Sequence, residues 1–355
     1  MPSEAEQAAL TAAYLAQQRL LAATLSRDLV LLVRQIFDVT DQGRSWSATK
    51  LALDSLIRER RRRSADLAAR YYVDLRGLAV SSPLGREARL RGERSSQFTP
   101  EMRLDPGTGL VTTRLGSSTE VSEATRTIEA PLPERSREDV EPAELDLPGD
   151  LSEQDAWAEL EKIAPLTPED ITDLDEDRVD ANLNATGIAS FKKAIRAGQT
   201  PERAVDTMAV NLSGASTTLV LEGGREVIHD AAMADDEAIG WARITDPDPC
   251  AFCAMLASRG AVYHSRATAG AAANKKFVGA GMFKFHNHDA CIAKPIFDPE
   301  DPALEVADDL YDRWLRATQG ASGQKKMLNA WTQYWNQLDP ADKPTTHTGD
   351  TAATA

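Results

Sequence analysis

The stretch TPERAVDTMAVNLSGASTTLVLEGG, residues 200–224, indicates the class of the fold. Thr200 before Pro201 places a hydroxyl N-cap in front of a proline at the first helical position, where no hydrogen bond is lost. Apolar side chains then recur at helical spacing and predict one core-facing stripe, which consists of Val205, Met208, Leu212, Ala215 and Leu219. Gly223 and Gly224 follow, and glycine adopts a left-handed backbone easily, so we predict that the helix ends there.

Helical patterns continue on both sides of this stretch. A further helix is expected over about residues 225 to 243, and Thr167 before Pro168 marks another helix start. Nearer the N-terminus, residues 5–39 have helically spaced apolar side chains in an Ala- and Gln-rich background, which favours one long amphipathic helix. A second helical stretch follows over roughly 46–80. The fold class is therefore predicted to be mainly α.

Composition divides the chain into four regions. Residues 1–83 are the N-terminal helical region, and residues 84–150 are typical of a polar acidic linker without sustained apolar periodicity. Residues 151–335 resume the helical pattern and contain a small irregular module at 240–300. Residues 336–355 are expected to be a disordered tail. We therefore expect a multi-domain helical protein.

Two features of the chain are interpreted as core rather than as site. Trp331 and Trp335 lie four residues apart, so they share one helix face, which favours core packing over an interface. His229 lies within a helical stretch, and we interpret it as an ordinary helix residue rather than a catalytic base. Neither feature predicts a catalytic or binding site.

The charge balance disfavours some partners. The chain carries a net charge of −15 at pH 7, so a phosphate backbone would repel the molecule as a whole. The run RERRRR at 58–63 is the local exception, an electropositive patch of Arg60, Arg61, Arg62 and Arg63. A solvated helix face is the simpler interpretation of this run, and an acidic partner surface or nucleic acid is the functional one. The longest strongly apolar run, LVLLV at 29–33, is too short to span a bilayer, so we expect no membrane partner.

The chain has three cysteines, and they are close together in sequence. Cys250 and Cys253 are spaced C-x-x-C, and Cys291 follows downstream. The first residues lack the basic start and apolar core of a signal peptide, so we expect a cytoplasm that keeps thiols reduced. Since an odd number of cysteines cannot close a full disulfide framework, metal ligation is the predicted use. A C-x-x-C turn presents two sulfurs to one zinc ion.

The remaining zinc ligands must come from downstream. Cys291 is one candidate, and either His288, in an H-x-x-C spacing, or His286 would complete the set, with Asp289 available as an oxygen ligand. Three thiolates and one neutral imidazole would make a closed, structural Zn²⁺ site with no open position for a substrate. One alternative is three buried cysteines with two surface histidines. Another is a redox-active C-x-x-C, which the missing βαβ pattern disfavours.

The sequence around the cysteines resembles a known family. The run GREVIHDAAMADDEAIGWARITDPDPCAFCAMLASRGAVYHS, followed by FHNHDACIAKPIF, is similar to the Mu F-like head-morphogenesis family, the minor capsid proteins of tailed bacteriophages, in the form common in phages of actinobacteria. The resemblance is sharp over about 222–297 and diffuse over 150–335. It implies a structural minor capsid protein that associates with the portal during procapsid assembly, in the virion and earlier in the host cytoplasm. The implied partners are portal and capsid or scaffold proteins, and no catalysis is required.

The resemblance also implies a set of ligands. Cys250 and Cys253 match the first cysteine pair of the family, His286 matches its histidine, and Cys291 matches its final cysteine. Asp289 stands where the family usually has its first downstream cysteine, which leaves the fourth ligand open between His286 and His288. The resemblance says little about residues 1–150.

Two other functions remain as alternatives. A capsid maturation protease is the first, because Ser258, His264 and Ser265 lie close together in sequence, although adjacency does not show that catalytic groups converge. The chain lacks a G-x-S-x-G nucleophile elbow in this region. A nucleic-acid-binding accessory factor is the second alternative, and the acidic net charge argues against it. The contiguous HNH at 286–288 is a coincidence, since nucleases of that name spread these residues along the chain.

Overall fold

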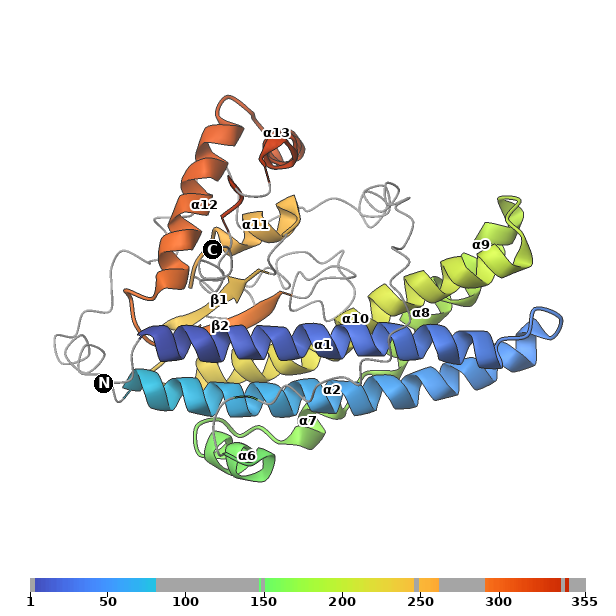
Figure 1. Cartoon of the computed structure of the whole chain (residues 1–355), viewed down its shortest axis with the longest axis horizontal. Helices are drawn as coiled ribbons and strands as arrows, with labels where there is room; N and C mark the ends of the chain where they lie inside the picture. Colours follow the sequence, from blue (N-terminus) through green and yellow to red (C-terminus); the bar gives the residue numbers. More distant parts are fainter. Residues whose placement is uncertain are drawn as a thin grey trace, which may run out of the picture.

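The computed structural model of the chain (Figure 1) describes residues 4–80, 147, 151–245, 249–261, 291–339 and 342–344. Within this part of the chain 75% of residues are helical, which confirms the predicted mainly α class. The expected linker at 84–150 lies outside the described residues except for Leu147, and the expected tail at 336–355 is described only in part. No helix in the described ranges is long and apolar enough to cross a membrane.

Three long helices form the body of the molecule (Figure 1): α1 (Glu4–Ile36), α2 (Gln42–Val80) and α10 (Pro201–Ala234). A short turn joins α1 to α2, and both helices pack against α10. Arg34, near the end of α1, pairs with Asp206, near the start of α10, at 2.8 Å. Ser26, earlier in α1, accepts a hydrogen bond from Ser213, later in α10. α1 and α10 therefore run antiparallel, and the predicted long helices near the N-terminus are confirmed.

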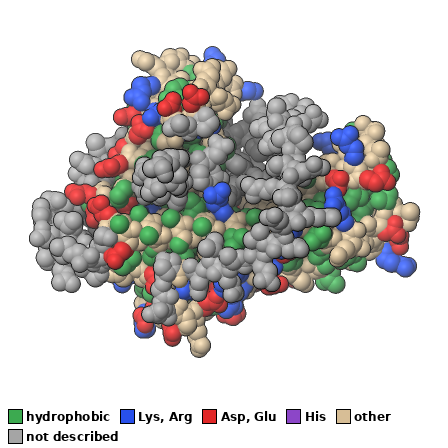
Figure 2. All heavy atoms as spheres, viewed as in Figure 1, with side chains coloured by type: hydrophobic (Ala, Val, Ile, Leu, Met, Phe, Trp, Pro, Cys, Tyr) green, Lys and Arg blue, Asp and Glu red, His purple; other side chains and the backbone are tan. Residues whose placement is uncertain are grey.

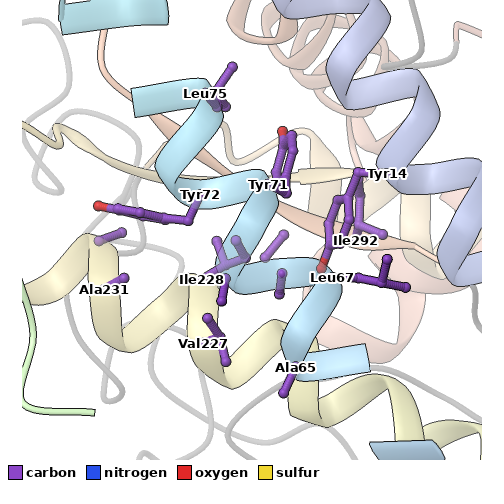
Figure 3. Close-up of a cluster of buried hydrophobic side chains, with 14 of the residues drawn as sticks. Tyr14, Ala65, Leu67, Tyr71, Tyr72, Leu75, Val227, Ile228, Ala231 and Ile292 are labelled. Atoms are coloured by element: carbon purple, nitrogen blue, oxygen red, sulfur yellow. The ribbon is translucent and has the colours of Figure 1, made fainter. Parts of the chain in front are cut away.

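Apolar side chains from these helices form two cores along the body. The first core surrounds Tyr14 and Tyr71, whose rings stack with centroids 4.2 Å apart (Figure 3). Val227 of α10 belongs to the same buried cluster. The second core lies toward the turn between α1 and α2, where Phe37 meets Phe191 edge to face at 5.1 Å. Burial of apolar surface stabilises such cores by about 25 cal/mol per Å².

The predicted end of the central helix at Gly223 and Gly224 is wrong, because α10 continues to Ala234. Neither glycine has a positive φ, so neither supplies a left-handed cap. Both instead allow a close approach of α2. A Cβ on Gly223 would lie 2.8 Å from the backbone oxygen of Arg61, and one on Gly224 would lie 2.8 Å from the backbone oxygen of Ser64.

The predicted helix over 225–243 is also wrong in its last part. α10 ends at Ala234, where Asp235 accepts hydrogen bonds from the Tyr72 hydroxyl at 3.0 Å and from Arg76 Nε at 2.6 Å. The chain then forms a buried strand, β1 (Gly240–Ile244), which pairs antiparallel with β2 (Ile292–Ile296). Both strands are buried along their whole length because they pack against α10.

The described residues between α2 and α10 form four short helices: α6 (Glu153–Glu161), α7 (Pro168–Thr172), α8 (Glu176–Thr186) and α9 (Ile188–Arg196). The two predicted helix starts are confirmed. Thr167 and Asp170 form a reciprocal capping box at the start of α7, and Thr200 accepts a hydrogen bond from the Arg203 amide at the start of α10. α6 and α7 pack on α2, whereas α8 and α9 pack on α10.

The C-terminal part of the chain adds a third core. It is formed by α11 (Ala251–Ala257), α12 (Pro302–Thr318) and α13 (Gln324–Gln337). Trp331 and Trp335 are both buried in it, as expected from their spacing, together with Trp314 of α12. These helices lie on the side of the β1–β2 sheet away from α2 (Figure 1).

Candidate functional site

The C-x-x-C pair lies at the start of α11. Cys250 is the N-cap residue of this helix, and its Sγ accepts a hydrogen bond from the Cys253 amide at 3.4 Å. The Cys250 side chain is exposed, whereas Cys253 is buried in the core around Tyr14 and Tyr71. The local sequence therefore places the two thiols on one compact turn, one facing solvent and one facing the interior.

Cys291 immediately precedes β2 and belongs to the same buried cluster as Cys253. A buried arginine of α10 holds its backbone: Arg225 donates from Nε at 3.1 Å and from Nη2 at 2.7 Å to the Cys291 carbonyl oxygen. Two cysteines that lie far apart in sequence thus belong to one buried cluster. Sequence reasoning missed Arg225, because its acceptor is a backbone carbonyl, which no residue type reveals.

The described residues supply only part of the predicted zinc site. Among them, no three His, Cys, Asp or Glu side chains are grouped closely enough to hold a metal ion. The remaining candidate ligands, His286, His288 and Asp289, lie outside the described residues. The thiols suit a thiophilic cation such as Zn²⁺ in their chemistry, but the three of them do not form a complete site. Zinc therefore stays a prediction.

His229 is a core residue of α10. Its ring is buried, its Nδ1 lies 2.7 Å from a carboxylate oxygen of Asp230, and it meets the Trp241 ring edge to face with the ring centroids 6.2 Å apart. This placement agrees with the interpretation of His229 as an ordinary helix residue. His229 and Arg225 are four residues apart and occupy one face of α10, the face that packs on the sheet.

The arginines of the run in α2 pair largely with acidic side chains of the same chain. Arg60 pairs with Asp28 at 3.1 Å, Arg62 pairs with Asp66 at 2.9 Å, and Arg63 pairs with Glu153. Arg62 and Arg63 each remain 42% exposed, so their charges still reach solvent. Figure 2 shows acidic as well as basic side chains over the described surface of the face turned to the viewer.

Arg61 does not belong to the predicted surface patch, because it is only 2% exposed. Its Nε donates to the Ile171 carbonyl oxygen at 2.6 Å, its Nη1 donates to the Leu219 carbonyl oxygen at 2.7 Å, and its Nη2 pairs with Glu226. One guanidinium therefore joins α2 to α7 and α10. The buried Arg61 guanidinium contributes to the fold, and it is not accessible to a partner protein.

Glu226 is the acidic partner of this buried arginine. Burial raises the pKa of its carboxyl group to about 7, and the Arg61 guanidinium opposes that rise. Glu222, one turn earlier on α10, pairs with Arg178 of α8 at 2.6 Å and also raises the pKa of Glu226. These four charges form a polar layer within the helical body. They link α2 and α8 to α10 through buried and partly buried ion pairs.

Of the residues considered for proteolysis, only Ser258 lies in the described part of the chain. It is buried, and its hydroxyl donates to the Met255 carbonyl oxygen at 2.7 Å, at the end of α11. His264 and Ser265 lie outside the described residues. The described residues thus place Ser258 in a helix-terminal hydrogen bond.

Comparison with known proteins indicates the class of this protein. Residues 159–317 match the family described as VG15 protein, which is a family of viral and phage proteins. The matched segment begins within α6 and ends within α12, so it includes all three cysteines and excludes α1, α2 and α13. Neither the curated proteins nor the solved structures contain a significant match to the chain. The match indicates a phage protein and does not single out the Mu F-like head-morphogenesis family.

Proposed function

We propose that this phage protein is a structural head-morphogenesis protein, a minor capsid protein that associates with the portal during procapsid assembly. The observation that carries the proposal is the family match over residues 159–317, which covers the segment with the Mu F-like sequence resemblance. The long helical body supports a structural role, since buried ion pairs join its helices to one another. In this proposal the protein resides in the virion, and its partners are portal and capsid or scaffold proteins.

The exposed part of the arginine run offers a docking surface in this proposal. Arg62 and Arg63 face solvent in part from the middle of α2, and their carboxylate partners are themselves on this chain. A partner with an acidic surface would exchange these internal ion pairs for intermolecular ones. Exposed charges act over a Debye length of about 10 Å at 0.1 M salt, so such docking would be sensitive to salt.

We also propose a structural Zn²⁺ bound by Cys250, Cys253 and Cys291, with His286, His288 or Asp289 as the fourth ligand. Two observations support it: the C-x-x-C pair lies on one compact turn, and Cys291 joins the buried cluster that contains Cys253. The metal would tie the start of α11 to the start of β2. Metal binding to such a site contributes free energy of folding, because the unfolded chain lacks the site.

Complementation of a phage that lacks this protein tests the structural role against the protease alternative. We expect Ser265→Ala to give normal numbers of mature heads with a processed major capsid protein. Reversal of both Arg62 and Arg63 to Glu should lower the number of heads. The matched control reverses Arg27 and Arg44, which are 60% and 90% exposed and change the net charge equally.

The protease alternative predicts the opposite pattern. Loss of an essential nucleophile costs several orders of magnitude in rate, so unprocessed capsid protein would accumulate with Ser265→Ala. Normal head numbers with the Arg62 and Arg63 reversal would contradict the proposed docking surface. Thermal unfolding of each purified variant shows whether a loss of heads reflects misfolding.

A further inference from the structure

Two tryptophans of α13 bind the backbone on either side of Cys250. Trp331 Nε1 donates to the Ala251 carbonyl oxygen at 2.6 Å, and Trp335 Nε1 donates to the Pro249 carbonyl oxygen at 2.8 Å. Both tryptophans are almost completely buried. The N-cap residue of α11 therefore lies between two peptide groups that a separate helix holds in place.

The two indole donors are themselves fixed by packing. Trp331 lies 5.3 Å from Trp335 and 5.5 Å from Trp314, measured between ring centroids. Tyr334 stacks on Trp331 at 5.6 Å. Since the rings cannot rotate freely inside this core, the two N–H groups point in set directions. Because both donors are already fixed by packing, their hydrogen bonds to the two carbonyl oxygens cost little additional side-chain entropy.

The backbone at Cys291 is held in the same manner, by a side chain of another helix. Arg225 of α10 donates two hydrogen bonds to the Cys291 carbonyl oxygen. Both cysteine segments are thus positioned through their backbone, by side chains that are not themselves thiols. α13 lies beyond the segment that matches the family, which ends at residue 317.

We propose that Trp331 and Trp335 are positioning residues for the thiol turn, which preset Cys250 and Cys253 to bind a thiophilic divalent cation. This inference rests on the proposed zinc site. The two hydrogen bonds hold the peptide group that precedes Cys250 and the peptide group that follows Ala251, and they thereby restrict the backbone from which the Cys250 Sγ projects. Preset ligands bind a metal more tightly, because less freedom is lost on binding.

Zinc affinity of the purified full-length protein tests the inference. Trp331→Phe and Trp335→Phe each keep an aromatic ring in the core and remove one N–H donor, and each variant retains the other hydrogen bond. We expect the affinity for Zn²⁺, measured by competition with a chromogenic chelator, to fall about 10-fold in each. Trp314→Phe is the matched control, because Trp314 lies in the same core and donates no such bond to the thiol turn. An equal affinity in the three variants would overturn the inference.

A second measurement separates this inference from the metal site itself. Hydrogen exchange of the α11 amides, measured on metal-free protein, should become faster with Trp331→Phe and Trp335→Phe than with Trp314→Phe. If the parent protein binds no zinc, the proposed metal site is wrong, and exchange still decides whether the tryptophans position the turn. Exchange in α11 that is the same in all three variants would show that they do not.

Discussion

Arg61 and Glu226 show how a single residue can depart from the role that its sequence context indicates. RERRRR is a run of like charges, and the simplest expectation places every member on a solvated face. The structure buries Arg61 between α2, α7 and α10, where two backbone carbonyls and one carboxylate accept from it. A buried charge of this kind is strongly destabilising when its partner is removed, because the remaining charge stays desolvated.

This pair predicts a pH dependence of stability. The pKa of Glu226 rises from 4.5 to about 7 on folding, so the folded chain binds this proton more tightly than the unfolded chain does. The contribution of the group is full below pH 4.5 and is lost as the pH rises through about 7. We expect the ionisation of Glu226 to lower the free energy of unfolding by roughly 1 to 3 kcal/mol as the pH rises from 5 to 8.

Urea unfolding of the parent protein and of Glu226→Gln at these two pH values checks the assignment. The Gln variant keeps the size and one acceptor oxygen of the side chain but cannot ionise. Its stability should therefore change less with pH than that of the parent protein. An equal pH dependence in both proteins would show that Glu226 is not the group responsible.

The thiols make a second prediction at the residue scale. Gently purified protein is expected to carry about one zinc per chain, and Cys250→Ser should lose the metal together with thermal stability. Cys250 is exposed, so the serine itself disturbs no core packing. Metal analysis and thermal unfolding with and without chelator provide the measurement. Zinc-free protein that has full stability in chelator would contradict the proposed site.

α10 shows which features of an element the sequence predicts. Its start follows from Thr200 and Pro201, and its buried face follows from the spacing of its apolar side chains, because both signals are local. The predicted helix end at Gly223 and Gly224 is wrong, because those glycines allow the close approach of α2, which lies far away in sequence. The strand β1 was missed for a related reason: GWARI is short and buried throughout, so it shows no alternation to distinguish it from helix.

The same limit applies to the candidate site. The cysteines and their spacing are visible in the sequence, because metal ligation requires particular side chains. The groups that hold the cysteines in place, Arg225, Trp331 and Trp335, bind backbone carbonyls and leave no such pattern. The spacing of the two tryptophans predicted their burial but not the hydrogen bonds of their indoles.

The close approach of α2 to α10 predicts the effect of Gly224→Ala. The added methyl group would lie 2.8 Å from both the backbone oxygen and the Oγ of Ser64, so the helices must move apart. We expect overpacking to cost about 1 to 3 kcal/mol in the free energy of unfolding, offset in part by a gain of about 1 kcal/mol from helix propensity, so that Gly224→Ala is less stable than the parent protein. Gly77→Ala is the control, because its methyl group would meet nothing within 4 Å in α2. Chemical denaturation that finds the two variants equally stable would contradict this account of the contact.

At the scale of the whole molecule, the described chain is one helical body with a small sheet and a C-terminal helical unit. The first buried core contains side chains from α1, α2, α10 and both strands, so the N-terminal helices and the segment with the cysteines share one interior. The family match covers only part of this assembly, since it lacks α1 and α2. Residues 1–83 and 151–335, which composition separates, are thus joined by a common core.

Recovery of the protein from infected cells tests the central claim most directly. An affinity-tagged copy should be purified during head assembly, at low salt, and the proteins that accompany it identified by mass spectrometry. The proposed structural role predicts that portal protein is recovered in a fixed ratio to the tagged chain and is released as salt is raised. Recovery of the tagged chain without portal, capsid or scaffold protein at low salt would contradict the proposal.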